Sequence, residues 1–181
     1  MITSMPCTRY FRNALVLTTI IVLSLTATSF AATSTMPCAT PEHKQFDFWL
    51  GNWKIGAPGS SATAHSTVTA SLDQCLIVEN WDGGRDHSGQ NLFGYSADDN
   101  TWYGMFADNE GRVHVFTSGK VSAGAAEFEG TSRGPNGETV LNRVKIMRQD
   151  PNRVEQIWQK STDNGKTWNI VFRSEYSRAN P

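Results

Sequence analysis

Residues 139–160 read TVLNRVKIMRQDPNRVEQIWQK, two stretches of alternating side chains on either side of Asp150-Pro151-Asn152. In a β-strand successive side chains point to opposite faces, so Val140, Asn142, Val144 and Ile146 would share one face. Asp, Pro and Asn are turn-forming residues. This part of the chain therefore predicts a β-hairpin with one largely apolar face.

The same rhythm extends in both directions, with turn-forming residues every eight to twelve positions from Asn52 onward. Strands are expected near residues 53–56, 62–72, 75–82, 91–96, 101–107, 113–120, 125–132, 139–148, 153–160 and 167–176. Consecutive hairpins that close on themselves leave no open edge. We therefore predict an all-β fold, an antiparallel up-and-down β-barrel of about ten strands of the lipocalin kind, with a β-sandwich as the main alternative.

A short helix is expected before the strands, over residues 41–51. Pro41 suits a first helical turn, and Gly51 suits a C-terminal stop. Phe46, Trp49 and Leu50 would fall on one face of this helix. That face predicts a plug or cap over an apolar interior.

The first residues have the parts of a secretory signal peptide. Arg9 and Arg12 precede an apolar stretch over residues 14–25, and Ser29-Phe30-Ala31 fits a cleavage site. The apolar stretch is shorter than the roughly 20 residues that span a bilayer as a helix. We therefore expect cleavage after Ala31, a signal peptide over 1–31, a single β-barrel domain over 32–181, and a periplasmic or secreted location.

Cleavage would remove Cys7 and leave Cys38 and Cys75 as the cysteines of the mature chain. An oxidising compartment favours a disulfide between them. On a chain-entropy argument the bond would stabilise the domain by roughly 3 to 4 kcal/mol. The alternative is a pair of free thiols.

Charge limits the possible partners. Without Arg9 and Arg12 the chain carries 14 basic and 17 acidic residues, a net charge of −3. Without a basic cluster or a long amphipathic stretch, the sequence argues against nucleic-acid binding and against stable membrane insertion. The four histidines are scattered, so neither a metal nor another cofactor is predicted. No oligomeric state is predicted.

Polar residues on otherwise apolar strand faces indicate an interior that holds a ligand, because a few polar groups can orient a small molecule between apolar walls. Tryptophans in strands could line such a cavity, although packing in the core is their commoner role. Glu79 shares a strand face with Trp81, inside the barrel or outside it. The candidate residues for a small, partly apolar ligand are Trp53, Glu79, Trp81, Trp102, Asn142, Gln156 and Trp158.

Two other functions stay open. One is an enzyme, a hydrolase or an isomerase, that uses Glu79 or His114 as a base. The other is a structural or interaction module whose barrel is filled by its own side chains. No catalytic residue is assigned, because the sequence contains no nucleophile elbow, phosphate loop or dinucleotide-binding fingerprint.

Residues 161–168, STDNGKTW, match the Asp-box pattern S-x-D-x-G-x-T-W. The expected role of this motif is structural, with a turn held by side-chain hydroxyls. Asp boxes occur in sialidases, whose propellers contain several copies, and one copy in about 150 residues cannot build propeller blades. In the last expected strand, simple alternation would place Trp168, Ile170, Phe172 and Tyr176 on one face.

Residues 38–53 and 74–81, together with the Asp-box hairpin, resemble a family of exported bacterial proteins of unknown function. That family has an FDFWLG-W opening and a GC-L-E-W strand, and the resemblance implies a calycin-like barrel without an established activity. A more distant similarity is to nitrobindin-type haem barrels, in which a histidine near the chain end holds the iron. Residues 115–181 contain no histidine, so haem is not expected here.

Overall fold

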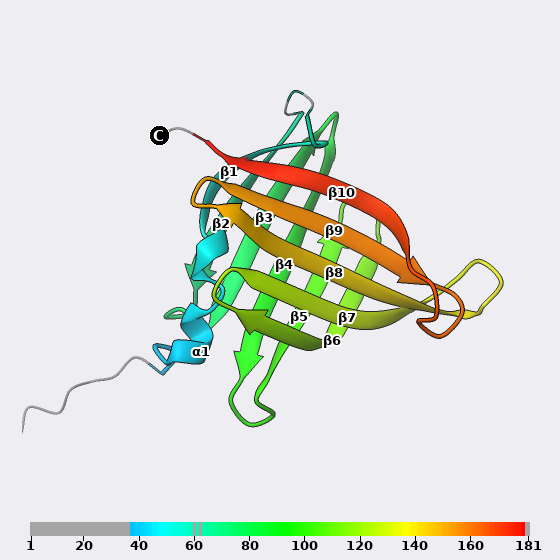
Figure 1. Cartoon of the computed structure of the whole chain (residues 1–181), viewed down its shortest axis with the longest axis horizontal. Helices are drawn as coiled ribbons and strands as arrows, with labels where there is room; N and C mark the ends of the chain where they lie inside the picture. The colour runs from blue at the N-terminus through cyan, green and yellow to red at the C-terminus, as the bar shows by residue number, and fades with distance from the viewer. Residues whose placement is uncertain (1–36, 60, 62, 180–181) are drawn as a thin grey trace, which may run out of the picture. The chain divides into compact units, whose positions relative to one another are not determined.

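The computed structural model describes residues 37–59, 61 and 63–179. The predicted signal peptide, its cleavage after Ala31 and Cys7 lie outside these residues. Within the described residues, ten antiparallel strands form a closed barrel in the order β1-β10-β9-β8-β7-β6-β5-β4-β3-β2 (Figure 1). The predicted up-and-down barrel is confirmed.

Each expected strand range overlaps one observed strand. The strands are β1 Gly51–Gly56, β2 Ala64–Ser71, β3 Leu76–Gly84, β4 His87–Ser96, β5 Thr101–Asp108, β6 Val113–Ser122, β7 Ala125–Arg133, β8 Thr139–Asp150, β9 Arg153–Ser161 and β10 Asn169–Arg178. The turn-forming residues between the apolar runs therefore locate the connections well.

The first and last strands close the barrel. In β1, Trp53 lies opposite Ser66 of β2 on one side and opposite Arg178 of β10 on the other. A β-sandwich would leave these two strands in separate layers or at open edges. The closed hydrogen-bonded ring excludes the sandwich alternative.

The predicted helix forms in two short pieces, α1 (Pro41–Lys44) and the 3-10 helix η1 (Asp47–Trp49). The backbone leaves the α-helical region at Phe46, where φ is −97° and ψ is 0°. This break lets Phe46 and Trp49 enter the barrel, and both side chains are fully buried. In the described part of the chain, no helix is long and apolar enough to cross a membrane.

A disulfide holds the helical segment at one end of the barrel. Cys38, just before α1, is bonded to Cys75 in the turn between β2 and β3. Because neighbouring strands are antiparallel, the β4–β5, β6–β7 and β8–β9 turns lie at this same end. The predicted pairing of the two cysteines is confirmed.

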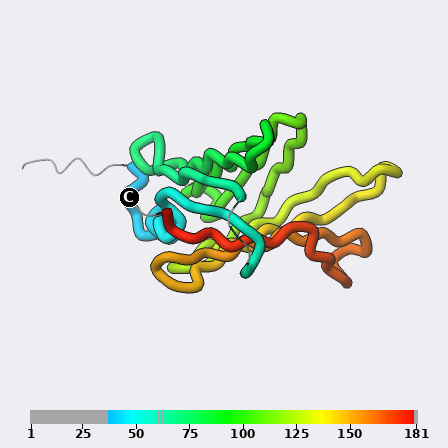
Figure 2. Tube along the Cα trace, turned by 90° about the horizontal axis from the view of Figure 1, so that it is seen from above, coloured from blue at the N-terminus to red at the C-terminus, as the bar shows by residue number. Residues whose placement is uncertain are grey.

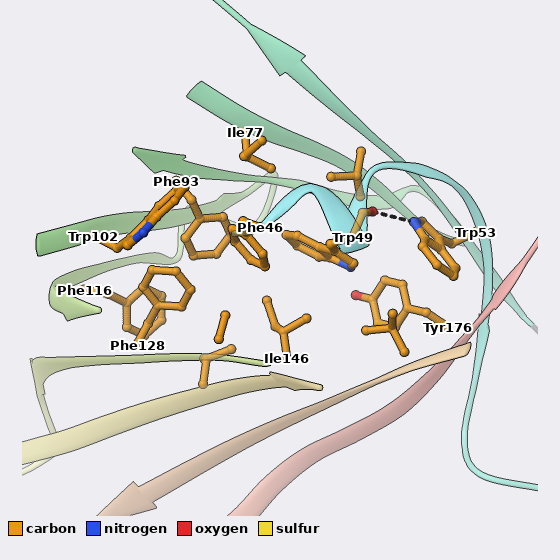
Figure 3. Packing of buried hydrophobic residues seen from close by; sticks show 14 of the residues in the cluster. Phe46, Trp49, Trp53, Ile77, Phe93, Trp102, Phe116, Phe128, Ile146 and Tyr176 are labelled. Atoms are coloured by element: carbon orange, nitrogen blue, oxygen red, sulfur yellow. Dashed lines mark hydrogen bonds between the residues drawn. The ribbon is translucent and has the colours of Figure 1, made fainter. Parts of the chain in front are cut away.

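The interior near the helices is filled by aromatic rings (Figure 3). The ring of Phe46 lies 5.3 Å from Trp49, 5.4 Å from Phe93 and 5.7 Å from Trp102, measured between centroids. Gly104 makes room for this packing, because a Cβ there would lie 2.7 Å from the Phe93 ring. This half of the barrel is therefore filled by its own side chains.

The opposite end contains the β3–β4, β5–β6, β7–β8 and β9–β10 turns, and these hairpins spread apart beyond the barrel (Figure 2). A bulge in β10 changes the side-chain alternation here. Ile170 lies opposite Gln159, whereas Phe172 lies opposite Trp158, so the register shifts at Val171. The prediction that Ile170 and Phe172 share a face is wrong, because the extra residue turns Ile170 outward and Phe172 inward.

Candidate functional site

A cavity of about 330 Å³ lies in the half of the barrel away from α1 and η1. Its walls are aromatic, its floor is polar, and charged residues surround its mouth. The aromatic walls include Trp81, Phe106, Phe116, Trp158 and Phe172. The floor contains Glu79, Asn91, Gln156 and Tyr176, and the mouth contains His87, Asp108, Arg112, His114 and Lys160.

Trp158 of β9 is the centre of the aromatic wall. Its ring lies 4.6 Å from His114, 5.7 Å from Phe106 and 5.9 Å from Phe116 between centroids. Its Nε1 donates a hydrogen bond to Oδ1 of Asn142 at 3.2 Å. Since Asn142 is buried on the neighbouring strand, this bond fixes the orientation of the indole.

Glu79 of β3 points into the barrel and is fully buried at the floor of the cavity. Its Oε1 accepts a hydrogen bond from Ser66 Oγ at 2.6 Å, and its Oε2 accepts one from Asn91 Nδ2 at 2.7 Å. Strand register explains these contacts, because Asn91 lies directly opposite Glu79 on β4. The sequence left the face of Glu79 open, and the structure places it inside.

Burial raises the pKa of Glu79, and this effect outweighs the hydrogen bonds from Ser66 and Asn91 that favour the carboxylate. The Tyr176 hydroxyl donates to Oε1 of Gln156 at 2.6 Å, which uses its single proton. The floor therefore combines a buried carboxyl group, whose pKa is raised, with a Tyr176 hydroxyl that donates to Gln156.

Two polar atoms at the floor remain available to a ligand. In the described residues, neither Nε2 of Gln156 nor Oδ1 of Asn91 has a hydrogen-bond partner. Both residues line the cavity, and each is 7% exposed. The floor thus presents one donor and one acceptor beneath the aromatic walls.

An ion-pair cluster borders the mouth. Arg112 lies 2.6 Å from Asp108 and 2.7 Å from Glu110, and its guanidinium is 3.0 Å from Nε2 of His87. Desolvation opposes ionisation of Asp108, yet hydrogen bonds from Arg112 hold the pKa of that carboxyl below its usual value. Ligand atoms of His87, Asp108 and Glu110 lie within 4.8 Å of one another, and the guanidinium of Arg112 already supplies a positive charge to both carboxylates.

All seven residues predicted to bind a ligand lie within the described residues, but only some border the cavity. Glu79, Trp81, Gln156 and Trp158 line it, and Asn142 supports Trp158 from behind. Trp53 and Trp102 instead pack in the aromatic core beside the helices, where Trp53 Nε1 donates to the Trp49 carbonyl oxygen at 2.9 Å (Figure 3). Tyr176, Asn91 and Lys160 were not among the predicted residues, although alternation within their strands would place each on an inward face.

The two candidate bases lie in different surroundings. Glu79 is bonded to Ser66, which is itself buried and does not line the cavity. His114 is packed against aromatic rings, and its pKa is lowered by burial and then by the nearby charges of Lys160 and Arg112. Among the described residues, neither base is hydrogen-bonded to a nucleophile that lines the cavity.

The Asp-box residues form a turn that satisfies its own polar groups. Ser161 Oγ accepts from the Gly165 amide at 2.9 Å, and Thr167 Oγ1 donates to Asp163 Oδ2 at 2.6 Å. The hydrogen bonds that the Thr167 hydroxyl, the Thr167 amide and the Ser161 hydroxyl donate to Asp163 lower the pKa of that carboxyl to about 2. Trp168 Nε1 donates to the Gly165 carbonyl oxygen at 3.1 Å. The geometry agrees with the structural role predicted for this motif.

The amino-acid sequence matches no protein-family model, and no curated protein matches it. A barrel fold by itself does not define an activity, since unrelated functions share such folds. The cavity is therefore the feature from which function is argued.

Proposed function

We propose that the barrel binds a small, partly apolar molecule in its cavity. The cavity lies in the half of the barrel away from α1 and η1, here called the open half. The observation that carries this proposal is the cavity of about 330 Å³ with aromatic walls and a polar floor. Small-molecule sites in proteins are typically concave, mainly apolar, and about 300 to 1,000 Å³ in volume. The free Gln156 donor and Asn91 acceptor would orient one polar group of the ligand.

Two features reduce the cost of binding. The carboxyl oxygens of Glu79 already accept hydrogen bonds from Ser66 and Asn91, so a ligand at the floor would not leave this buried group without partners. The hydrogen bond from Trp158 to Asn142 holds the main aromatic wall in place before the ligand enters. A preformed wall loses less conformational entropy on binding than a mobile one.

Titration with N-phenyl-1-naphthylamine, an uncharged fluorophore, tests the proposal. Val144 lines the cavity, whereas Val140 lies on the same strand and is buried without lining it. Val144→Phe should fill part of the cavity and weaken binding about tenfold, while Val140→Phe should leave the Kd within about twofold.

Absence of saturable binding to the wild-type protein would contradict the proposal. Equal losses in the two variants would also contradict it, because the fluorophore would then respond to altered core packing. Mass spectrometry of protein purified under native conditions would identify a ligand that remains bound.

We also propose that the chain is exported to the periplasm or secreted, and that it belongs with the exported bacterial family that its opening residues resemble. The Cys38–Cys75 disulfide supports export, because such bonds persist mainly in oxidising compartments. The test is the mass of the protein recovered from an expressing bacterium. A mature chain that begins at Ala32 is expected, and a cytoplasmic, full-length product would contradict the proposal.

A further inference from the structure

Lys160 lies at the mouth of the cavity, and within the part of the chain that the structure describes its amine has no carboxylate partner. It lines the cavity, lies opposite the inward-facing Asn142 in the strand register, and is only half-buried. Among the described residues, no carboxylate oxygen lies within 4.0 Å of its amine. Its Nζ lies 6.0 Å from the Trp158 ring centroid.

The other charges at the mouth do not neutralise Lys160. Arg112 is paired with Asp108 and Glu110, and His87 lies beside the same carboxylates. Lys160 and Arg112 both lower the pKa of His114, and their effects are larger than the opposing effect of Asp108. Among the described residues, Lys160 is thus a cation at the mouth whose charge no carboxylate pairs with, and its amine lies 6.0 Å from the Trp158 ring centroid.

We propose that the cavity accepts an amphipathic organic anion whose apolar body lies against Trp158 and Phe116 and whose acidic group pairs with Lys160. This inference rests on the proposed function and defines its ligand class. A carboxylate or sulfonate would satisfy the free ammonium group, whereas a cationic ligand would meet a charge of its own sign. The aromatic walls would hold the apolar body by burial of its surface.

Two fluorophores with the same ring system test this assignment. 1-Anilinonaphthalene-8-sulfonate carries a sulfonate, and N-phenyl-1-naphthylamine is its uncharged counterpart. Lys160→Gln should raise the Kd of the sulfonate about fivefold, the upper range for a partly exposed ion pair, and should change the Kd of the uncharged fluorophore less than about twofold. Lys160→Arg should restore the affinity for the sulfonate.

Lys54→Gln is the matched control, because Lys54 is exposed on β1 and does not line the cavity. It removes the same unit of charge and should leave both Kd values unchanged. Competition between the two fluorophores on the wild-type protein should show that they share one site. Added salt should weaken binding of the sulfonate to the wild type more than binding of the uncharged compound, a comparison that needs no variant.

The possible failures separate the two proposals. If the uncharged fluorophore binds in the cavity but Lys160→Gln does not weaken sulfonate binding, the anion assignment is overturned and the proposed function stands. If Lys160→Gln weakens both compounds equally, Lys160 acts through packing, and the anion assignment is again overturned. If neither compound binds the wild type, both proposals fail.

Discussion

The two halves of this barrel share the same strands but have different interiors. Near the helices, Phe46 and Trp49 enter the barrel and pack against Phe93, so the space is filled. In the other half, Trp158 borders a cavity of about 330 Å³. Inward-facing aromatic residues line both halves, so the difference comes from the segment that enters one end. The strand pattern thus identifies which side chains face the interior. The helical segment that carries Phe46 and Trp49, here called the plug, determines which part of that interior remains open to a ligand.

Removal of a large side chain from each half gives the largest expected contrast. Trp49→Ala should lower the free energy of unfolding by about 3 to 5 kcal/mol, because the ring is fully buried among other rings. Trp158→Ala should cost about 1 to 2 kcal/mol, because one side of that ring already faces a cavity. Urea denaturation of both variants measures the difference, and equal losses would show that the two interiors are packed alike.

The Cys38–Cys75 disulfide should stabilise the half of the barrel that Phe46 and Trp49 fill, without affecting the ligand site in the other half. Replacing Cys38 and Cys75 together with Ser should lower the free energy of unfolding by about 3 to 4 kcal/mol, because a constraint across 37 residues of sequence is lost. Affinity for N-phenyl-1-naphthylamine should stay unchanged in the folded variant. A large loss of affinity with little loss of stability would mean that the cavity depends on the plug.

Asn142 supports the wall of the open half from behind. Asn142→Leu should cost about 1 to 3 kcal/mol, because it leaves Trp158 Nε1 and Ser132 Oγ without their partner in a buried region. It should also weaken fluorophore binding, since the indole loses its fixed orientation. Unchanged affinity, measured at a concentration of urea where the variant stays folded, would show that Trp158 is held by ring packing alone.

The smallest expected effect concerns Glu79 and depends on pH. Since its pKa is raised on folding, the wild type should lose stability as pH rises from the unfolded value near 4.5 toward the folded value. Glu79→Gln should remove this loss, so the variant should gain stability relative to the wild type as pH increases. Urea denaturation across that pH range measures the trend. A constant deficit of the variant at every pH would indicate an ionised, hydrogen-bonded Glu79.

Much of this fold could be predicted from the sequence, because alternation and turn residues are local signals. The strand ranges and the closure followed from them, whereas the Cys38–Cys75 pairing followed from the expected export, which would leave only these two cysteines in an oxidising compartment. The position of a side chain along the barrel axis does not follow from the local sequence pattern. The sequence therefore could not show that Trp53 packs in the filled half whereas Trp158 borders the cavity. The bulge at Val171 also left no clear trace in composition, and it reversed the expected face of Ile170.

The candidate site was harder to predict for the same reason. Glu79 and Gln156 were found because they are polar residues in apolar strands. The cluster around Arg112 was missed, because His87 begins β4 and Asp108 ends β5, and the two residues meet only through the register in which these strands pair. In the sequence, Lys160 cannot be distinguished from any other lysine in a strand. Only the folded structure shows that no carboxylate of the described residues pairs with it at the mouth of the cavity.

Indole NMR signals from the two halves test the central claim most directly. On addition of N-phenyl-1-naphthylamine, the Nε1–H resonances of Trp81 and Trp158 should shift in a saturable way, because both side chains line the cavity. Those of Trp49 and Trp53 should stay in place, because they lie in the filled half. Shifts at Trp49 and Trp53 equal to those at Trp158, or no shift at Trp158, would contradict a binding cavity in the open half.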